Sequence, residues 1–92
     1  MRPSRNPELI NAMSVEIKAR RQELGFSQED LAGQCDLDRP YISLLEVGRK
    51  QPTISVLYRI AVGLGLSLEE FSRRVENRYA SAVKASSGRK AT

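Results

Sequence analysis

The sequence predicts an all-helical domain, and three observations support this fold class. No segment alternates apolar and polar residues over the length of a strand, and no Asn-Gly or Asp-Gly hairpin turn occurs. Glycine and proline lie between segments whose apolar residues recur at helical spacings. The 92 residues are enough for one hydrophobic core. We therefore expect a single domain of five helices.

Polar residues at the expected helix starts are of the types that cap a helix N-terminus. They are, in chain order, Ser4 or Asn6, Ser27, Asp38, Thr53 and Ser67. Asp30 follows Ser27 by three residues, and Glu70 follows Ser67 by three, which is the spacing of a capping box. Glycines at positions 25, 48, 63 and 65 mark helix ends. The second helix ends near residue 35, so only a short "DLD" turn separates it from the third.

Each expected helix has an apolar stripe for the core. The stripes are Leu9, Ile10, Met13, Ile17 and Leu24; Leu31 and Ala32; Ile42 and Leu45; Ile54, Leu57, Ile60, Ala61 and Leu64; and positions 68, 71, 75, 79 and 83. The last stripe continues beyond the point where the core should close. Val75, Tyr79 and Val83 are therefore expected either to contact a second copy of the chain or to lie on their own domain. The final "SSGRKAT" is expected to be a disordered tail.

The net charge of +4 suggests a nucleic-acid partner, but its distribution weakens that argument. Residues 1–13, an extension of the first helix, carry two basic residues and one acidic residue. The central part, residues 14–76, carries nine basic and ten acidic residues, and the C-terminal part, residues 77–92, carries four basic and none acidic. The excess lies in the end segments, so DNA binding has to be argued from local arrangement.

Composition excludes several classes of function. One cysteine and no histidine leave no disulfide framework and no usual zinc site, and no phosphate-cradling glycine loop is present. We therefore expect neither an enzyme nor a cofactor. Cys35 is expected to be a small core residue, with a redox-sensing thiol as the alternative. No membrane span or secretory signal is present, so we expect a cytoplasmic protein.

Two short helices joined by a tight turn are what a protein needs to place one helix in a DNA groove. The segment "SQEDLAGQCDLDRPYISLLEVGRKQPTISVLYRIAVGLGLSLEEF", residues 27–71, resembles the helix-turn-helix domains of phage Cro and repressor type, also called the XRE family. "LDRPYIS" is especially similar to small controller regulators of restriction-modification systems. The resemblance implies a five-helix fold like that of the lambda repressor, with residues 14–76 as the DNA-binding domain and a recognition helix at about 39–47.

The resemblance also implies roles for individual residues. Those expected to contact phosphates are Ser27 and Gln28 at the start of the second helix, and Arg49, Lys50 and Gln51 after the recognition helix. Arg39 is expected to read guanine through two hydrogen bonds. Tyr41 and Ser43 are expected to reach a phosphate or a base edge, and Leu44, on the same face as Pro40, a thymine methyl.

Each of these residues has a plainer interpretation. Arg39 could be only solvated, Gln28 only a cap, and Arg49 and Lys50 a hydrophilic turn. Tyr41 could pack on the domain surface, and Leu44 could belong to the core.

The resemblance implies one internal salt bridge and shows two departures from the family pattern. Arg21 and Glu46 match a pair that links the first helix to the end of the recognition helix in some members; the alternative is two independent surface charges.

Asp36 stands where the family often has glycine, and it adopts the left-handed conformation only at a cost. Pro40 replaces a residue that is often polar, so fewer groups remain for base reading.

These observations together predict a regulator of transcription that binds double-stranded DNA as a homodimer on a palindromic operator. The alternative is a protein-interaction module of the same fold, acting as an antitoxin or adaptor with weak DNA binding.

Overall fold

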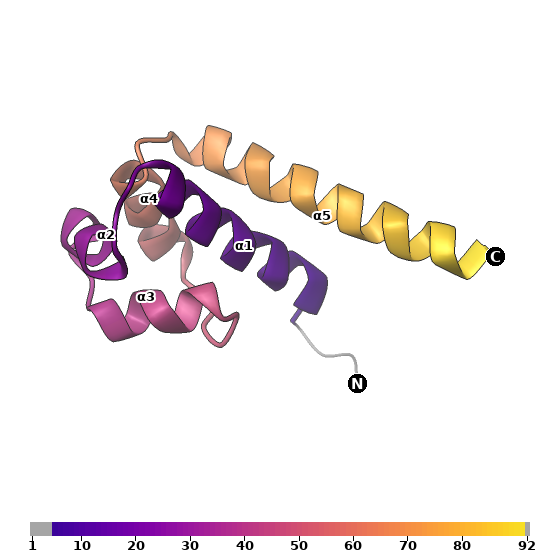
Figure 1. Cartoon of the computed structure of the whole chain (residues 1–92), viewed down its shortest axis with the longest axis horizontal. Coiled ribbons are helices and arrows are strands. Elements are labelled where there is room, and N and C mark those ends of the chain that lie inside the picture. Colours follow the sequence, from indigo (N-terminus) through magenta and orange to yellow (C-terminus); the bar gives the residue numbers. More distant parts are fainter. Residues whose placement is uncertain (1–4, 92) are drawn as a thin grey trace.

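The computed structural model describes residues 5–91, and the side chains of residues 5–85. Five helices follow one another: α1 (Pro7–Glu23), α2 (Gln28–Cys35), α3 (Arg39–Glu46), α4 (Ile54–Gly63) and α5 (Leu68–Ala91). The described residues contain no strand, and the predicted all-α, five-helix fold is confirmed. In Figure 1, α1 lies between α3 on one side and the long α5 on the other.

The predicted N-caps form at four of the five helices. Asn6 Oδ1 accepts a hydrogen bond from the Leu9 amide at 3.1 Å, and Thr53 Oγ1 accepts one from the Val56 amide at 3.3 Å. Both capping boxes are complete, at the start of α2 and of α5. Asp38 occupies the N-cap position of α3, but its side chain makes no capping hydrogen bond. Ser4 lies outside the described residues.

The core lies where all five helices meet. Its fully buried members are Ile17, Leu31, Ile42, Leu45, Ile60, Leu64 and Phe71. Three residues of the predicted stripes are wrong, because Leu9, Leu24 and Ile54 are 40%, 36% and 67% exposed. They stand at or near helix ends: Leu9 in the first turn of α1, Leu24 directly after α1, and Ile54 at the start of α4.

In the second half of α5, Val75 and Tyr79 lie on their own domain, which was one of the two sequence expectations. Val75 is buried in the domain's own core, and Tyr79 is half-buried beside that core, with its hydroxyl oxygen accepting a hydrogen bond from Asn6 Nδ2 at 3.1 Å. A partner-facing stripe that includes Val75 is therefore wrong; only Val83 stays exposed. The helix α5 continues to Ala91, and the disordered tail expected from the sequence stays a prediction.

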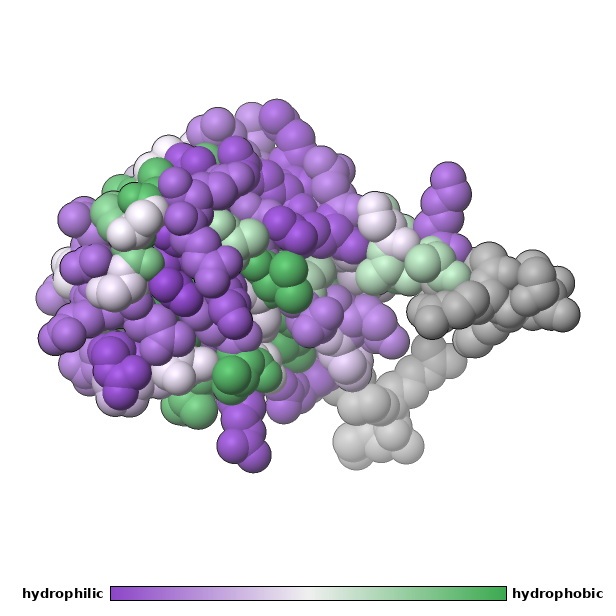
Figure 2. Space-filling model, in the orientation of Figure 1, coloured by the Kyte–Doolittle hydropathy of each residue, from purple (hydrophilic) through white to green (hydrophobic). Residues whose placement is uncertain are grey.

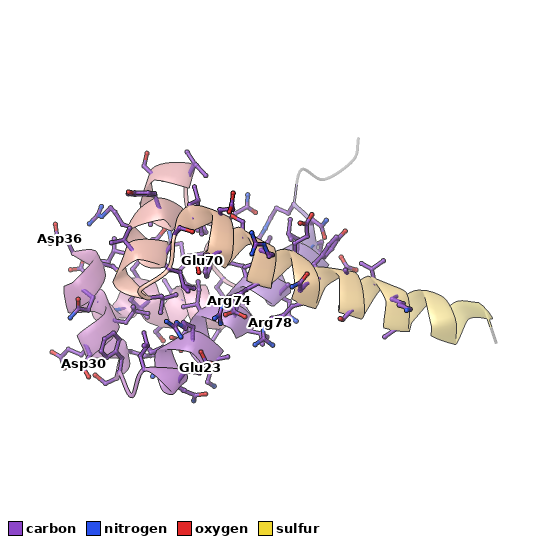
Figure 3. The ribbon with its side chains drawn as sticks, turned by 90° about the horizontal axis from the view of Figure 1, so that it is seen from above. Glu23, Asp30, Asp36, Glu70, Arg74 and Arg78 are labelled. Atoms are coloured by element: carbon purple, nitrogen blue, oxygen red, sulfur yellow. The ribbon has the colours of Figure 1, made fainter. Side chains whose placement is uncertain are left out.

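A buried carboxylate holds α5 along α1. Glu16 is only 3% exposed, and its oxygens accept hydrogen bonds from Arg78 Nε at 2.7 Å and from Arg74 Nη1 at 3.4 Å. Arg74 also lies 3.7 Å from Glu23. Figure 3 shows Arg74 and Arg78 on the α5 side that faces α1, close to Glu23. Because these residues come from distant parts of the sequence, spacing alone did not predict the cluster.

The packing of α2 against α4 depends on one glycine. A Cβ atom on Gly63 would lie 2.5 Å from Cys35 Sγ, closer than two such atoms can approach. Cys35 is 2% exposed, as expected for a core residue, and burial raises the pKa of its thiol to about 11 against a smaller lowering by Arg59. Gly63 therefore allows the close approach of the two helices, besides marking the end of α4.

The surface is mostly hydrophilic. On the face shown in Figure 2, apolar residues form separate patches among polar ones. Among the described residues, no helix combines the length and apolar character needed to span a bilayer.

Candidate nucleic-acid interface

The turn between α2 and α3 is short and has a left-handed residue at its start. Asp36 has φ 55° and ψ 49°, as expected where the family often has glycine. The amide of Leu37 donates to the Ala32 carbonyl at 2.9 Å, so the chain reverses directly after α2. This turn sets the angle between the two helices of the helix-turn-helix.

Arg59 of α4 stabilises that turn, and sequence reasoning missed it. Its Nε donates to the Cys35 carbonyl at 3.1 Å, and its Nη2 donates to the Asp36 carbonyl. The guanidinium also lies 3.7 Å from the Asp36 carboxylate. A cation at the C-terminal carbonyls of α2 is favourable both as a cap and toward the helix dipole. These contacts offset the strain of the left-handed aspartate.

The expected salt bridge between α1 and α3 is present and buried. Arg21 Nε donates to Glu46 Oε2 at 2.6 Å, and Arg21 Nη2 donates to Glu46 Oε1 at 3.0 Å. The two side chains are 11% and 3% exposed. A further N–H of Arg21 donates to the Phe26 carbonyl at 2.8 Å. The hydrogen bond to Glu46 raises the pKa of Arg21, with burial opposing it.

Two further polar residues extend this pair toward the surface. Gln28 Nε2 donates to Glu46 Oε1 at 3.1 Å, and Gln28 Oε1 accepts from Arg39 Nη1 at 3.3 Å. A continuous chain of hydrogen bonds thus runs from Arg21 through Glu46 and Gln28 to the exposed Arg39. The sequence indicated each residue separately, but it did not indicate that Gln28 holds Arg39.

The exposed part of α3 is its first turn. Arg39 and Pro40 are exposed, whereas Tyr41, Ser43 and Leu44 are half-buried. Tyr41 packs partly against the core, so its plainer interpretation is correct in part. Ile42 and Leu45 are fully buried, as predicted. Arg39 is therefore the most accessible hydrogen-bonding side chain of the helix.

A glycine directs the chain after α3. Gly48 has φ 77°, a conformation that favours glycine, and the Arg49 amide donates back to the Leu44 carbonyl at 2.9 Å. The exposed side chains of Arg49, Lys50 and Gln51 therefore follow directly beyond the C-terminal end of the helix.

The N-terminal end of α2 supplies a second polar edge. Ser27 is exposed, but its Oγ already accepts the Asp30 amide at 3.0 Å in the capping box. The Asp30 carboxylate accepts a hydrogen bond from the Ser27 amide at 2.9 Å, and this bond, with a further contribution from the Ser27 side chain, lowers the pKa of the Asp30 carboxyl group. In the part of the chain that the structure describes, no three or more His, Cys, Asp or Glu side chains are grouped so as to hold a metal ion.

This fold and this arrangement of polar residues define a helix-turn-helix protein, and comparison with known proteins gives the same result. The family model described as "Helix-turn-helix" matches residues 17–71, more than half of the chain. The chain therefore belongs to this family, and its resemblance to controller regulators is confirmed by individual relatives.

One such relative is the control protein C.MunI of Mycoplasma sp., which is 39% identical over 59 residues, covering 64% of this chain and 80% of the relative. An uncharacterized helix-turn-helix regulator of Methanothermobacter thermautotrophicus is 42% identical over 53 residues, covering 58% of this chain and 77% of the relative. The restriction-modification controller protein C.Esp1396I, solved as a tetramer in complex with its natural 35 base-pair operator, superimposes with a TM-score of 0.74. It has 38% sequence identity, and the match covers 78% of this chain and 95% of that one.

Proposed function

We propose that this protein is a transcriptional regulator that binds double-stranded DNA sequence-specifically, with the first turn of α3 in the major groove. The observation that carries the proposal is the exposed Arg39, held by Gln28 at the tip of the helix-turn-helix. Similarity to a controller protein solved on its operator supports the same function. A protein of this class acts in the cytoplasm on DNA and needs no catalytic residue or cofactor.

Base reading is assigned mainly to Arg39. A guanidinium in the groove donates two parallel hydrogen bonds to O6 and N7 of guanine, a pairing worth about 1–3 kcal/mol against a wrong base. Leu44 and Pro40 would supply apolar contact to a thymine methyl, and Tyr41 and Ser43 a contact to a phosphate or base edge.

Phosphate contacts are assigned to the N-terminus of α2 and to the residues that follow α3. Ser27 and Gln28 stand at the N-terminus of α2, where backbone amides and the helix dipole favour an anion. Arg49, Lys50 and Gln51 stand beyond the C-terminus of α3. Such contacts position the domain on the duplex without reading its sequence.

A domain of this size contacts few bases, so we propose that two copies bind a palindromic operator, reading half-sites about 34 Å apart.

The exposed apolar residues of α4, Ile54, Tyr58 and Val62, recur every four positions and thus share one face of the helix. We assign a second copy of the chain to this face. The test is the molar mass in solution: Ile54→Glu should favour the monomer, whereas Leu24→Glu should not. Val83→Glu should also leave the dimer intact, because Val83 lies on α5 and outside this face.

The experiment that tests DNA recognition is selection of duplexes from a random pool, followed by fluorescence anisotropy across a salt titration. We expect an enriched palindrome whose affinity exceeds that of random DNA by at least about 10³. Recovery of no enriched sequence would instead favour the adaptor alternative.

A further inference from the structure

A basic residue outside the helix-turn-helix motif lies at the end of the recognition helix. Arg5, which precedes α1, donates a hydrogen bond through Nη2 to the Gly48 carbonyl at 3.5 Å. The two residues are 43 positions apart, and Gly48 follows Val47, the C-cap residue of α3. Figure 1 shows the start of α1 beside the loop after α3. A Cβ atom on Gly48 would also lie within 4 Å of Ser14 and Ile10, so α1 and this loop are in close contact.

This location gathers positive charge. Arg49 and Lys50 follow Gly48 directly, and all three basic side chains are exposed. None of the three takes part in an ion pair with another described residue. Arg5 uses one N–H on the Gly48 carbonyl, and a guanidinium has five, so further donors remain for an anion.

We propose that Arg5 is an additional phosphate-contacting residue that forms, with Arg49 and Lys50, a basic cluster at the C-terminal end of α3. The inference rests on the proposed DNA binding. A recognition helix presents its N-terminal residues to the bases, so its other end lies toward the phosphate backbone that borders the groove. A cation held at that end by a main-chain carbonyl is already placed for a phosphate before DNA arrives.

A purely structural role makes a different prediction. In that case Arg5 would only stabilise the loop after α3, through its hydrogen bond to the Gly48 carbonyl. Arg5→Gln distinguishes the two roles, because glutamine keeps a donor for Gly48 but removes the charge. Arg5→Lys keeps the charge. The control is Arg73→Gln, which also removes one exposed positive charge, but on α5, which lies across the molecule from α3.

The experiment measures the dependence of DNA affinity on salt for the full chain and these three variants, on a selected duplex and on a random one. For Arg5→Gln, the slope of log K against log[salt] should be less steep by about 0.9 for each bound copy of the chain, and thus by about 1.8 for the proposed dimer, equally on both duplexes. Arg5→Lys and Arg73→Gln should keep the original slope. Melting curves monitor the fold of each variant.

Two results would overturn the inference: an unchanged slope for Arg5→Gln, or the same loss for Arg73→Gln. In either case the full chain still prefers its selected duplex, so the proposed function stands. If the full chain itself shows no preference between the two duplexes, the proposed function fails, and the role of Arg5 in it fails as well.

Discussion

Arg21 and Glu46 form a buried ion pair with two hydrogen bonds, at 2.6 and 3.0 Å, which joins α1 to the last turn of the recognition helix. Removing Arg21 would leave the carboxylate of Glu46, which is 3% exposed, without its main partner. We expect Arg21→Ala to lower the free energy of unfolding by about 3–5 kcal/mol. Chemical denaturation measures this.

The control for Arg21 is Arg73→Ala, which breaks an exposed pair with Glu69 four residues away. That change should cost no more than about 0.5 kcal/mol. Nearly unchanged unfolding of Arg21→Ala would contradict the importance of the buried pair.

Arg39 and Lys50 should differ in how their loss affects DNA binding. Arg39→Ala should cost about 1–3 kcal/mol on the selected duplex and relax the preference at one base position. Lys50→Ala should weaken binding to all sequences alike, because it removes a phosphate contact. Anisotropy on selected and random duplexes measures both effects. An equal loss on both duplexes for Arg39→Ala would remove its assignment as a base-reading residue.

Gln28 should affect DNA binding partly through Arg39, because Gln28 Oε1 accepts a hydrogen bond from Arg39 Nη1 at 3.3 Å. Gln28→Ala should therefore lower sequence preference as well as affinity. In a double-mutant cycle with Arg39→Ala, the coupling energy for DNA binding should be about 0.5–3 kcal/mol. Strictly additive effects would show that the two residues act independently.

Gly63 should tolerate no side chain, because a Cβ atom there would meet Cys35 Sγ at 2.5 Å. Gly63→Ala should destabilise the fold by about 1–3 kcal/mol, and Cys35→Ala in the same chain should recover part of that loss. Gly33 is the matched control, since it lies in α2 with nothing within 4 Å of its added Cβ. Gly33→Ala should stabilise the protein by about 0.4–1 kcal/mol. Thermal and chemical unfolding would show whether the two glycines differ in this way.

Cys35 should be unreactive in the folded protein. Burial raises the pKa of its thiol to about 11, so very little thiolate is present near pH 8, and the sulfur is also covered by protein. Alkylation at pH 8 should follow global unfolding and speed up in denaturant. Modification of the native protein at the rate of a free thiol would revive the redox-sensor alternative.

The sequence by itself determined the five helices and where each begins. Caps such as Ser27 with Asp30 join residues three positions apart, so their geometry is already contained in a short segment. The family resemblance added Arg21 with Glu46, which no local spacing indicates. Periodicity was less reliable for burial, because a stripe shows which residues share a face but not which of them another helix covers; Leu9 and Ile54 belong to predicted stripes and are exposed.

Only the tertiary structure decided the contacts that join distant segments. Gln28 meets Arg39 across 11 residues, Arg59 supports the turn at Asp36 across 23, and Tyr79 meets Asn6 across 73. Such pairs depend on the angles at which helices pack, which a linear pattern does not contain. The burial of Val75 in the core and the close approach of α2 and α4 at Gly63 also depend on how the helices pack. The residues proposed to read bases could therefore be predicted from the sequence as residue types at given positions. The hydrogen-bond network that holds Arg39 in place could be found only in the folded structure.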